Sequence, residues 1–436
     1  MSDFTYRDGQ LCAEDVPLAE IAAAVGTPAY VYASAGMRAR VRRFFAAFAG
    51  QPVLLCYALK ANSNLAVIRT LAAEGAGAEV VSGGELERAL AAGVPPRHIV
   101  FSGVGKSRDE MIAALDAGIV QFNVESVPEL IVLGEVAAAR RRQAPVAIRI
   151  NPDVAAESHD KISTGRRHDK FGIAYKQAPE VYDLASRLAG IEIVGLHLHI
   201  GSQILSLEPF EAAYRRGIEL LGALRRSGIA IRRLDLGGGL GVRYQAEPEL
   251  DLEAYAALIR RLTFGLEIEL VFEPGRWLVA ESGVLLAKVL YVKPGAERPC
   301  IVLDAGMNNL LRPALYDAYH PVLPVALPPA GAALQPADLA GPICESADVF
   351  ARRRDLPPLG PEDLIVLTGA GAYGAVMASD YNSRPMAAEV LVDGRRHAVV
   401  KPRIEPAARF ADERLPPWLA PSPMTRGAAR ERGELA

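Results

Sequence analysis

A lysine that follows an apolar run is the first residue whose position suggests chemistry. Residues 53–57 form the run, and the sequence continues as Y-A-L-K-A-N (57–62), which places Lys60 directly after it. Most lysines at strand ends only extend their charge into solvent. A lysine held in apolar surroundings has a lowered pKa and becomes a nucleophile. Lys60 is therefore a candidate for a covalent bond to a carbonyl group.

Two glycine-rich segments differ in what they can bind. The segment L-D-L-G-G-G-L-G (234–241) contains Gly237, Gly238 and Gly239, and glycines let backbone N–H groups approach an anion closely. A plain tight turn is the alternative interpretation. The segment S-G-V-G-K-S (102–107) resembles part of a nucleoside-triphosphate loop, but the first glycine of that motif would fall at Val100. We therefore exclude that kind of nucleotide site.

The motif F-E-P-G-R-W (272–277) places a carboxylate and a guanidinium on either side of a Pro–Gly turn. These groups are Glu273 and Arg276, with Gly275 between them. A surface ion pair is the plainer interpretation. In a binding site, the guanidinium suits an anion and the carboxylate suits a ring nitrogen.

Two histidines lie close together in H-L-H-I-G-S-Q (197–203). In a strand, His197 and His199 would point to the same side. We disfavour a metal site because no Asp, Glu or Cys stands near them in the sequence to complete a ligand set. A flat imidazole against an aromatic ligand is the preferred interpretation, with Ser202 in the following turn as a hydrogen-bond donor.

One cofactor, pyridoxal 5′-phosphate, uses all of these groups. It needs a lysine for its aldehyde, N–H donors for its phosphate, a flat residue for its ring face and a partner for its pyridine nitrogen. A carboxylate partner keeps that nitrogen protonated. The ring then withdraws electrons and favours carbanion chemistry at the α-carbon of an amino acid.

The elements that position these groups alternate between strands and helices. Eight short apolar runs separated by helical patterns predict a (β/α)8 TIM-like barrel, whose active site lies at the carboxyl ends of its strands. A doubly wound sheet is the alternative, because sequence does not give strand order. The predicted strands are Val53–Tyr57, Ala78–Val81, His98–Phe101, Val120–Asn123, Val146–Ile150, Val194–Ile200, Leu234–Leu236 and Leu270–Phe272.

After about residue 283 the pattern predicts a β-sandwich-like or β-barrel-like domain. Strand-like runs occupy 284–293, 300–304, 364–368 and 388–400, and a Pro-rich stretch (321–330) is expected to be a loop or linker. The predicted division is a cofactor-binding barrel at 28–282, a β domain from 1–27 and 283–410, and a charged, Pro-containing tail at 411–436 with partial disorder.

Composition excludes several classes of protein. The chain has 436 residues, 48 Lys and Arg against 51 Asp and Glu, and a net charge of −3, which argues against binding nucleic acid. We find no run of 18 uncharged apolar residues and no secretory leader, so we expect no membrane association. The four cysteines form no C-x-x-C pair, which favours reduced thiols in the cytoplasm and no metal centre.

From about residue 25 to 405 the chain resembles the diaminopimelate decarboxylases, pyridoxal-phosphate enzymes of the alanine-racemase-like class (fold type III). The motifs above and V-V-S-G-G-E-L (80–86) mark the class. More specific are R-P-A-L-Y-D-A-Y-H (312–320), C-E-S-A-D (344–348) and the segment from 371 to 385, and 161–173 fits as well. Departures are mild, such as Glu79 where the family often has Asp.

The resemblance implies a role for each candidate residue. Lys60 carries the cofactor, His199 stacks on its ring and Glu273 pairs with its pyridine nitrogen. The other implied cofactor contacts are Ser202, Gly237, Gly238, Gly239, Gly275, Arg276 and Tyr373.

The same resemblance implies the substrate, meso-2,6-diaminoheptanedioate (meso-diaminopimelate), which would lose one CO2 to give L-lysine in the last step of lysine biosynthesis. Arg276, Arg312 and Tyr316 would hold its distal carboxylate, and Tyr373 would also touch it. Glu345 would hold the distal ammonium. Cys344 would be the proton donor, reaching in from the second subunit of a head-to-tail homodimer.

Three alternatives remain. A decarboxylase of ornithine, arginine or lysine is disfavoured by Arg312, because those substrates have no distal carboxylate. A racemase is disfavoured by the chain length and by the motif around Cys344. A non-catalytic cofactor-binding relative is disfavoured because Lys60 and the β domain are both present.

Overall fold

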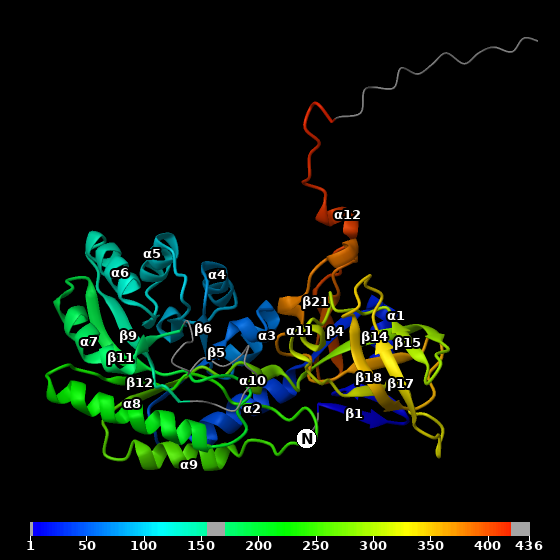
Figure 1. The fold of residues 1–436 in the computed structure, drawn as a ribbon, viewed down its shortest axis with the longest axis horizontal. Helices are drawn as coiled ribbons and strands as arrows, with labels where there is room; N and C mark the ends of the chain where they lie inside the picture. Colours follow the sequence, from blue (N-terminus) through cyan, green and yellow to red (C-terminus); the bar gives the residue numbers. More distant parts are fainter. Residues whose placement is uncertain (1–2, 155–170, 420–436) are drawn as a thin grey trace, which may run out of the picture.

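The computed structural model describes residues 3–154 and 171–419. It shows a barrel of strands and helices beside a domain made mostly of strands (Figure 1). The described part of the predicted tail, 411–419, extends away from both domains. Residues 420–436 and most of the 161–173 motif lie outside the described residues.

Eight parallel strands form the barrel, which confirms the predicted fold class. The ring closes because the eighth strand pairs with the first (Phe272 opposite Leu55), and this closure excludes the doubly wound sheet. The short β10 (Ile173–Ala174) pairs with the end of β9. The barrel strands are β5 (Val53–Ala58), β6 (Gly77–Val80), β7 (Ile99–Phe101), β8 (Gln121–Val124), β9 (Ala144–Asn151), β11 (Ile191–His197), β12 (Arg233–Asp235) and β13 (Glu269–Phe272).

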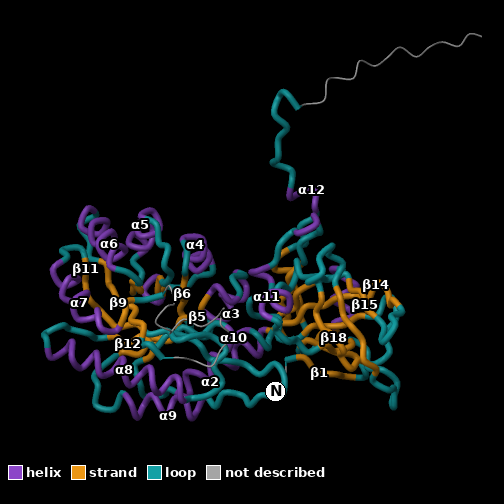
Figure 2. The backbone as a smooth tube through the Cα atoms, viewed as in Figure 1, coloured by secondary structure: helices purple, strands orange, loops and turns teal. Residues whose placement is uncertain are grey.

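Helices surround these strands (Figure 2). Three of them begin with Ser-x-x-Glu, in which the serine side chain accepts the N–H of the glutamate and caps the helix: Ser82, Ser107 and Ser126. The helices of this domain are α2 (Ser34–Ala47), α3 (Leu65–Ala72), α4 (Gly83–Ala91), α5 (Arg108–Ala117), α6 (Val127–Ala139), α7 (Ala178–Arg187), α8 (Glu208–Arg226), α9 (Leu252–Leu262) and α10 (Arg276–Val279), with short 3₁₀ turns η1 (Leu59–Ala61), η2 (Pro96–His98) and η4 (Tyr175–Gln177).

The second domain is built around the long strand β14, which bonds to β4, β15 and β19. A small antiparallel sheet at the N-terminus and α1 pack beside it. Its elements are β1 (Phe4–Arg7), β2 (Gln10–Ala13), β3 (Val16–Pro17), α1 (Leu18–Val25), β4 (Ala29–Ala33), β14 (Gly283–Lys293), β15 (Cys300–Leu303), α11 (Arg312–Tyr316), β16 (Val322–Pro324), β17 (Gln335–Ala340), β18 (Val349–Leu356), β19 (Leu364–Leu367), η5 (Ala375–Met377), η6 (Tyr381–Ser383), β20 (Ala388–Asp393), β21 (Arg396–Lys401) and α12 (Pro406–Arg409).

Two segments differ from the sequence prediction. Strand β4 falls within the segment predicted as barrel, 28–282, but it pairs with β14 and β20 of the second domain. The Pro-rich stretch predicted as a loop contains β16, whose Pro324 lies at the end of the strand, where a missing N–H is tolerated. Both strands depend on partners far away in the sequence.

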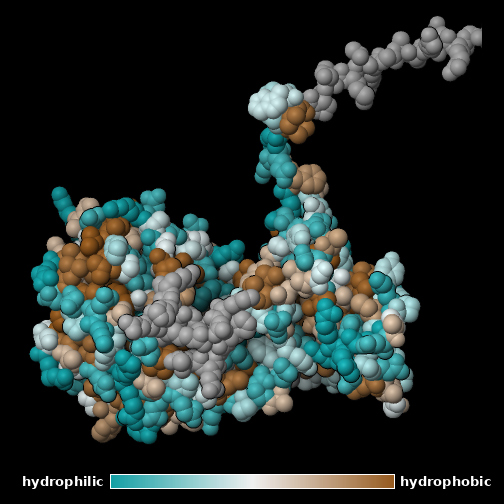
Figure 3. Space-filling model, in the orientation of Figure 1, coloured by the Kyte–Doolittle hydropathy of each residue, from teal (hydrophilic) through white to brown (hydrophobic). Residues whose placement is uncertain are grey.

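The largest apolar core lies between the barrel strands and the surrounding helices and continues into the second domain, whose small sheet covers a second core. A small third cluster, Leu54, Cys56, Val100 and Val271, lies inside the barrel. The interspersed polar and apolar surface of one face is visible in Figure 3. Within the described ranges, we find no helix with the length and apolar character needed to cross a membrane.

Candidate active site

Lys60 lies in η1, immediately after β5, and bonds to a carboxylate on the next strand. Its Nζ is 2.9 and 3.0 Å from the two carboxylate oxygens of Glu79, which is fully buried. Burial opposes the charge of Lys60, but the Glu79 carboxylate outweighs it and raises the pKa of the lysine. Burial raises the pKa of Glu79 to about 7. The lysine side chain is 38% exposed, so a ligand can reach it.

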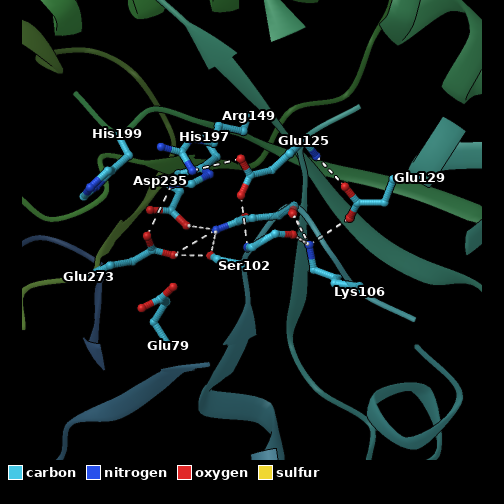
Figure 4. A network of polar contacts seen from close by, with 12 residues as sticks. Glu79, Ser102, Lys106, Glu125, Glu129, Arg149, His197, His199, Asp235 and Glu273 are labelled. Atoms are coloured by element: carbon cyan, nitrogen blue, oxygen red, sulfur yellow. Dashed lines mark hydrogen bonds and ion pairs between the residues drawn. The ribbon is translucent and has the colours of Figure 1, made fainter. Parts of the chain in front are cut away.

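Glu273 receives hydrogen bonds from the interior of the barrel (Figure 4). Its Oε1 accepts from Asn123 Nδ2 at 2.8 Å and from Ser102 Oγ at 3.3 Å, and its Oε2 lies 3.3 Å from His197 Nε2. Burial disfavours its charge, but His197 outweighs this and lowers the pKa of Glu273. The carboxylate is therefore held ionised at the barrel mouth.

Asp235 is a second carboxylate beside His197. It accepts hydrogen bonds from Gln121, Asn123 and the backbone N–H of Gly237. One potential ligand atom each from His197, Asp235 and Glu273 lies within 4.8 Å of the others. Acidic residues therefore do lie near His197 in space, although none stands near it in the sequence, because Asp235 and Glu273 come from the ends of the two following strands. Amide and hydroxyl donors already occupy these carboxylates.

Backbone hydrogen bonds join the loops that carry the predicted motifs. The N–H of Glu273 donates to the carbonyl of Gly237, and the N–H of Ala58 donates to that of Pro274. The N–H of Tyr373, in the second domain, donates to the carbonyl of Ala61 at 2.7 Å. The lysine turn, the glycine loop, the E-P-G-R turn and Tyr373 thus belong to one site.

His199 lies beside the glycine loop. Its Nδ1 accepts the N–H of Gly238 at 3.1 Å, and burial lowers its pKa well below the ordinary value. The imidazole is therefore neutral and fixed in orientation. A side chain at Gly238 would lie 2.4 Å from the carbonyl oxygen of Glu273, so only glycine leaves the loop this close.

Arg276 begins α10 and points toward the predicted phosphate side. It is 6% exposed, donates to Ser202 Oγ at 3.2 Å and lies 4.8 Å from the ring centre of Tyr373. It also donates to the hydroxyl of Tyr244 at 3.1 Å, a residue that sequence reasoning missed. The structure thus brings Arg276, Ser202 and Tyr373 together.

Arg312, at the start of α11, approaches Arg276 from the second domain. It is 6% exposed, and its Nη1 donates to Tyr244 Oη at 3.1 Å and to His320 Nε2 at 2.9 Å. His320 was also missed, although it ends the quoted 312–320 motif. Tyr316, at the other end of α11, is half-buried and contributes to the electrostatic surroundings of Arg276.

Cys344 and Glu345 are exposed, unlike the residues described so far. The backbone N–H of Cys344 donates to Asn382 Oδ1 at 2.8 Å. Among the contacts of the described residues, neither joins the group around Lys60. Their roles remain predictions.

The network below the site contains further residues that sequence reasoning missed. Gln121 and Asn123 occupy alternate positions of the buried strand Q-F-N-V, a polar pattern that could have identified them. Lys106, in the segment excluded as a nucleotide loop, is buried and donates to Gly103, Asn123 and Glu129 (Figure 4). These contacts, together with the Phe101 ring 5.7 Å from its Nζ, place it between the barrel strands and the start of α6.

The side chains present fit pyridoxal phosphate. Lys60 is accessible for the aldehyde, and neutral His199 provides a flat face. The Glu273 carboxylate is ionised, as a protonated pyridine nitrogen requires. The glycine loop excludes side chains from the phosphate side, where Arg276 Nε is buried without a hydrogen-bond partner.

Comparisons with known proteins agree with this set of groups. Residues 34–280 match the family model for the pyridoxal-binding domain of pyridoxal-dependent decarboxylases. Diaminopimelate decarboxylases of Zymomonas mobilis and Pseudomonas aeruginosa are 48% and 50% identical, each over 96% of this chain and 100% of the relative. The crystal structure of Helicobacter pylori diaminopimelate decarboxylase complexed with L-lysine has a TM-score of 0.87 and 41% identity, covering 90% of this chain and 98% of that one.

Proposed function

Because the chain belongs to the diaminopimelate decarboxylase family of pyridoxal-dependent decarboxylases, we propose that it converts meso-diaminopimelate to L-lysine and CO2. The observation that carries the substrate is the pair Arg276 and Arg312. Both are buried, and in the described part of the chain neither forms an ion pair with a carboxylate. A substrate with a distal carboxylate supplies that missing charge.

Four residues of this chain prepare the reacting end of the substrate. Bound pyridoxal phosphate supplies a ring that withdraws the electron pair left when the bond to CO2 breaks. Lys60 would hold the cofactor through its aldehyde carbon, whose oxygen leaves as water, and Glu79, its 2.9 Å neighbour, would accept protons from the amine. Glu273 would keep a proton on the pyridine nitrogen, while His199 would cover one face of the ring and keep water from it.

The other residues recognise the distal end and complete the reaction. Arg276, Arg312 and Tyr316 bind the distal carboxylate, and Tyr373 contacts both cofactor and substrate. Glu345 binds the distal ammonium. The Cys344 thiol gives its proton to the α-carbon, where the new C–H bond replaces the bond to CO2. The thiolate then recovers a proton from solvent.

We also propose that two copies of the chain form a homodimer with shared active sites. The exposure of Cys344 and Glu345 supports this arrangement, because both can then enter the site of the other copy. A reducing cytoplasmic location is supported by all four cysteines being free thiols.

The direct test is to supply the purified protein, loaded with pyridoxal phosphate, with meso-diaminopimelate and to measure CO2 and L-lysine. We expect stoichiometric release of both products. Release of CO2 from ornithine, arginine or lysine, with none from the diacid, would replace the proposed substrate. Lys60→Ala should lose both turnover and the absorbance band of lysine-bound cofactor, which separates true catalysis from cofactor binding.

Subunit mixing tests the shared site. Lys60→Ala and Cys344→Ala are each expected to be inactive or strongly impaired alone. After exchange of subunits, a mixed dimer has one site with both native residues and should recover part of the activity. Exchange without recovery would place Cys344 in the site of its own chain or outside the reaction.

A further inference from the structure

Tyr244 lies between the two arginines that we assign to the substrate, yet the roles proposed above leave it without one. It follows the glycine loop and is 9% exposed. Its hydroxyl oxygen accepts one hydrogen bond from Arg276 Nη1 and one from Arg312 Nη1, each 3.1 Å long. One oxygen atom thus links a residue of the barrel to a residue of the second domain.

The charges around Tyr244 are unbalanced. Two guanidiniums donate to it, and the other acceptors bonded to them are Ser202 and His320, both uncharged. Burial alone would raise the pKa of Tyr244, but the two guanidiniums outweigh burial and lower it. Because like charges repel strongly in a buried site, a shared acceptor is needed to keep the guanidiniums side by side.

The ring of Tyr244 is fixed by its neighbours. It packs edge-to-face against His320, with ring centres 5.6 Å apart, and Arg312 lies 4.9 Å from its ring centre. Its backbone N–H donates to Glu247 at 2.7 Å. Gly369 leaves room for the ring, because a side chain there would lie 2.9 Å from Tyr244 Cε1. The hydroxyl is therefore a rigid reference point for both arginines.

We propose that Tyr244 is a positioning residue that sets the spacing of Arg276 and Arg312 for the distal carboxylate of the substrate. This inference rests on the proposed function. With the diacid bound, the carboxylate shares its two oxygens between the guanidiniums, and the phenol keeps them at the spacing that this requires. Basic amino acids without a distal carboxylate leave both charges uncompensated, so the same arrangement selects against them.

The test is Tyr244→Phe in the cofactor-loaded enzyme, with Tyr182→Phe as the matched control. Tyr182 is also buried, at 0% exposure, and its hydroxyl makes a hydrogen bond to the carbonyl of Gly195 on the outer side of the barrel. For Tyr244→Phe we expect the KM for meso-diaminopimelate to rise about tenfold or more, with kcat changed less than about threefold. Heptanedioate, the same diacid without amino groups, should become a weaker competitive inhibitor, with an inhibition constant raised by a similar factor.

Other measurements separate positioning from a general loss of structure. Absorbance of the bound cofactor and the urea midpoint should match those of Tyr182→Phe. A second variant, Gly369→Ala, keeps the hydroxyl but presses on the ring, and it should raise KM in the same direction. Its urea midpoint is measured as well, because alanine is also strained at the φ of 67° found there. The inference is overturned if KM and heptanedioate inhibition stay at wild-type values, or if kcat falls as much as KM rises. Inactivity of the wild type on the diacid would instead overturn the proposed function.

Discussion

Two histidines, each 1% exposed, occupy opposite electrostatic surroundings in this molecule. His197, at the end of β11, faces Asp235 and Glu273, whose charges outweigh burial and raise its pKa. Burial and the charge of Arg312 lower the pKa of His320, which follows α11, to about 3. The same side chain is thus held toward the imidazolium in one cluster and neutral in the other.

The difference shows which cluster contains charges of both signs and which contains cations alone. In the acidic cluster (His197, Asp235, Glu273 and Asn123), protein donors reach both carboxylates. In the basic cluster (Arg276, Arg312, Tyr244 and His320), two cations share neutral acceptors. A buried charge needs a partner. We therefore expect the basic cluster to take its counter-charge from an anionic ligand, and the acidic cluster to hold the Glu273 carboxylate ionised.

The largest expected effect comes from removing the charge of the acidic cluster. Glu273→Gln keeps the size of the side chain and its contact with Asn123, but a neutral amide no longer favours a proton on the pyridine nitrogen. We expect kcat to fall about a hundred- to a thousandfold, a loss typical for a preorganised electrostatic contact. Steady-state kinetics measure this, with cofactor absorbance as the control for loading. Near-normal kcat would show that the acidic cluster does not govern the ring.

In the basic cluster, Arg312→Met removes the charge while keeping an unbranched side chain. We expect kcat/KM for the diacid to fall about ten- to a hundredfold, the cost of losing a charge-assisted hydrogen bond to the substrate. Discrimination against L-ornithine and L-lysine should decrease in parallel. An equal loss for all substrates would show that Arg312 acts on the cofactor side and that the two clusters share one role.

The same comparison shows what sequence could and could not predict. Lys60, His199, Glu273 and Arg276 were found because each lies just past a strand, where a barrel collects its functional groups. Tyr244 was missed because its partners lie 32 and 68 residues away and in different domains. The segment that forms β4 was assigned to the barrel for the same reason, since its partner β14 begins some 250 residues later. Local sequence patterns predicted the strands and helices, whereas contacts between segments distant in the sequence could be identified only from the folded structure.

A substitution of Asn123 tests how much the two carboxylates of the acidic cluster depend on hydrogen-bond donors of the protein. Its amide donates to both Asp235 and Glu273, so Asn123→Ala leaves two buried carboxylates with fewer donors. We expect the free energy of unfolding in urea to fall by about 2 kcal/mol, within the range for a buried group that loses its partner. Thr70→Ala is the control, because Thr70 makes one bond to a helix carbonyl and should cost less. Equal losses would mean that the remaining donors, Ser102, Gln121 and the N–H of Gly237, are sufficient for the two carboxylates.

The smallest expected effect distinguishes the two histidines by pH. Because the folded pKa of His320 lies near 3, below about 6.5 when unfolded, the unfolded chain takes up a proton that the native protein rejects as pH falls below about 6.5. This costs about 2 kcal/mol of stability at pH 5. The contribution of His197 to stability has the opposite sign. Because its folded pKa is raised, it stabilises the fold at pH values below the unfolded pKa, and this stabilisation is lost as pH rises through the folded pKa.

Glutamine variants of the two histidines isolate these contributions, because glutamine does not titrate. Relative to wild type, His320→Gln should become less destabilising, or stabilising, as pH falls from 8 to 5, whereas His197→Gln should become more destabilising over the same range. Urea unfolding of the cofactor-free proteins at several pH values measures both differences, and each variant is the control for the other. If the stability differences of the two variants changed with pH in the same direction, the charges around the two rings would not differ as the geometry requires. The basic cluster would then need no anionic ligand to balance it.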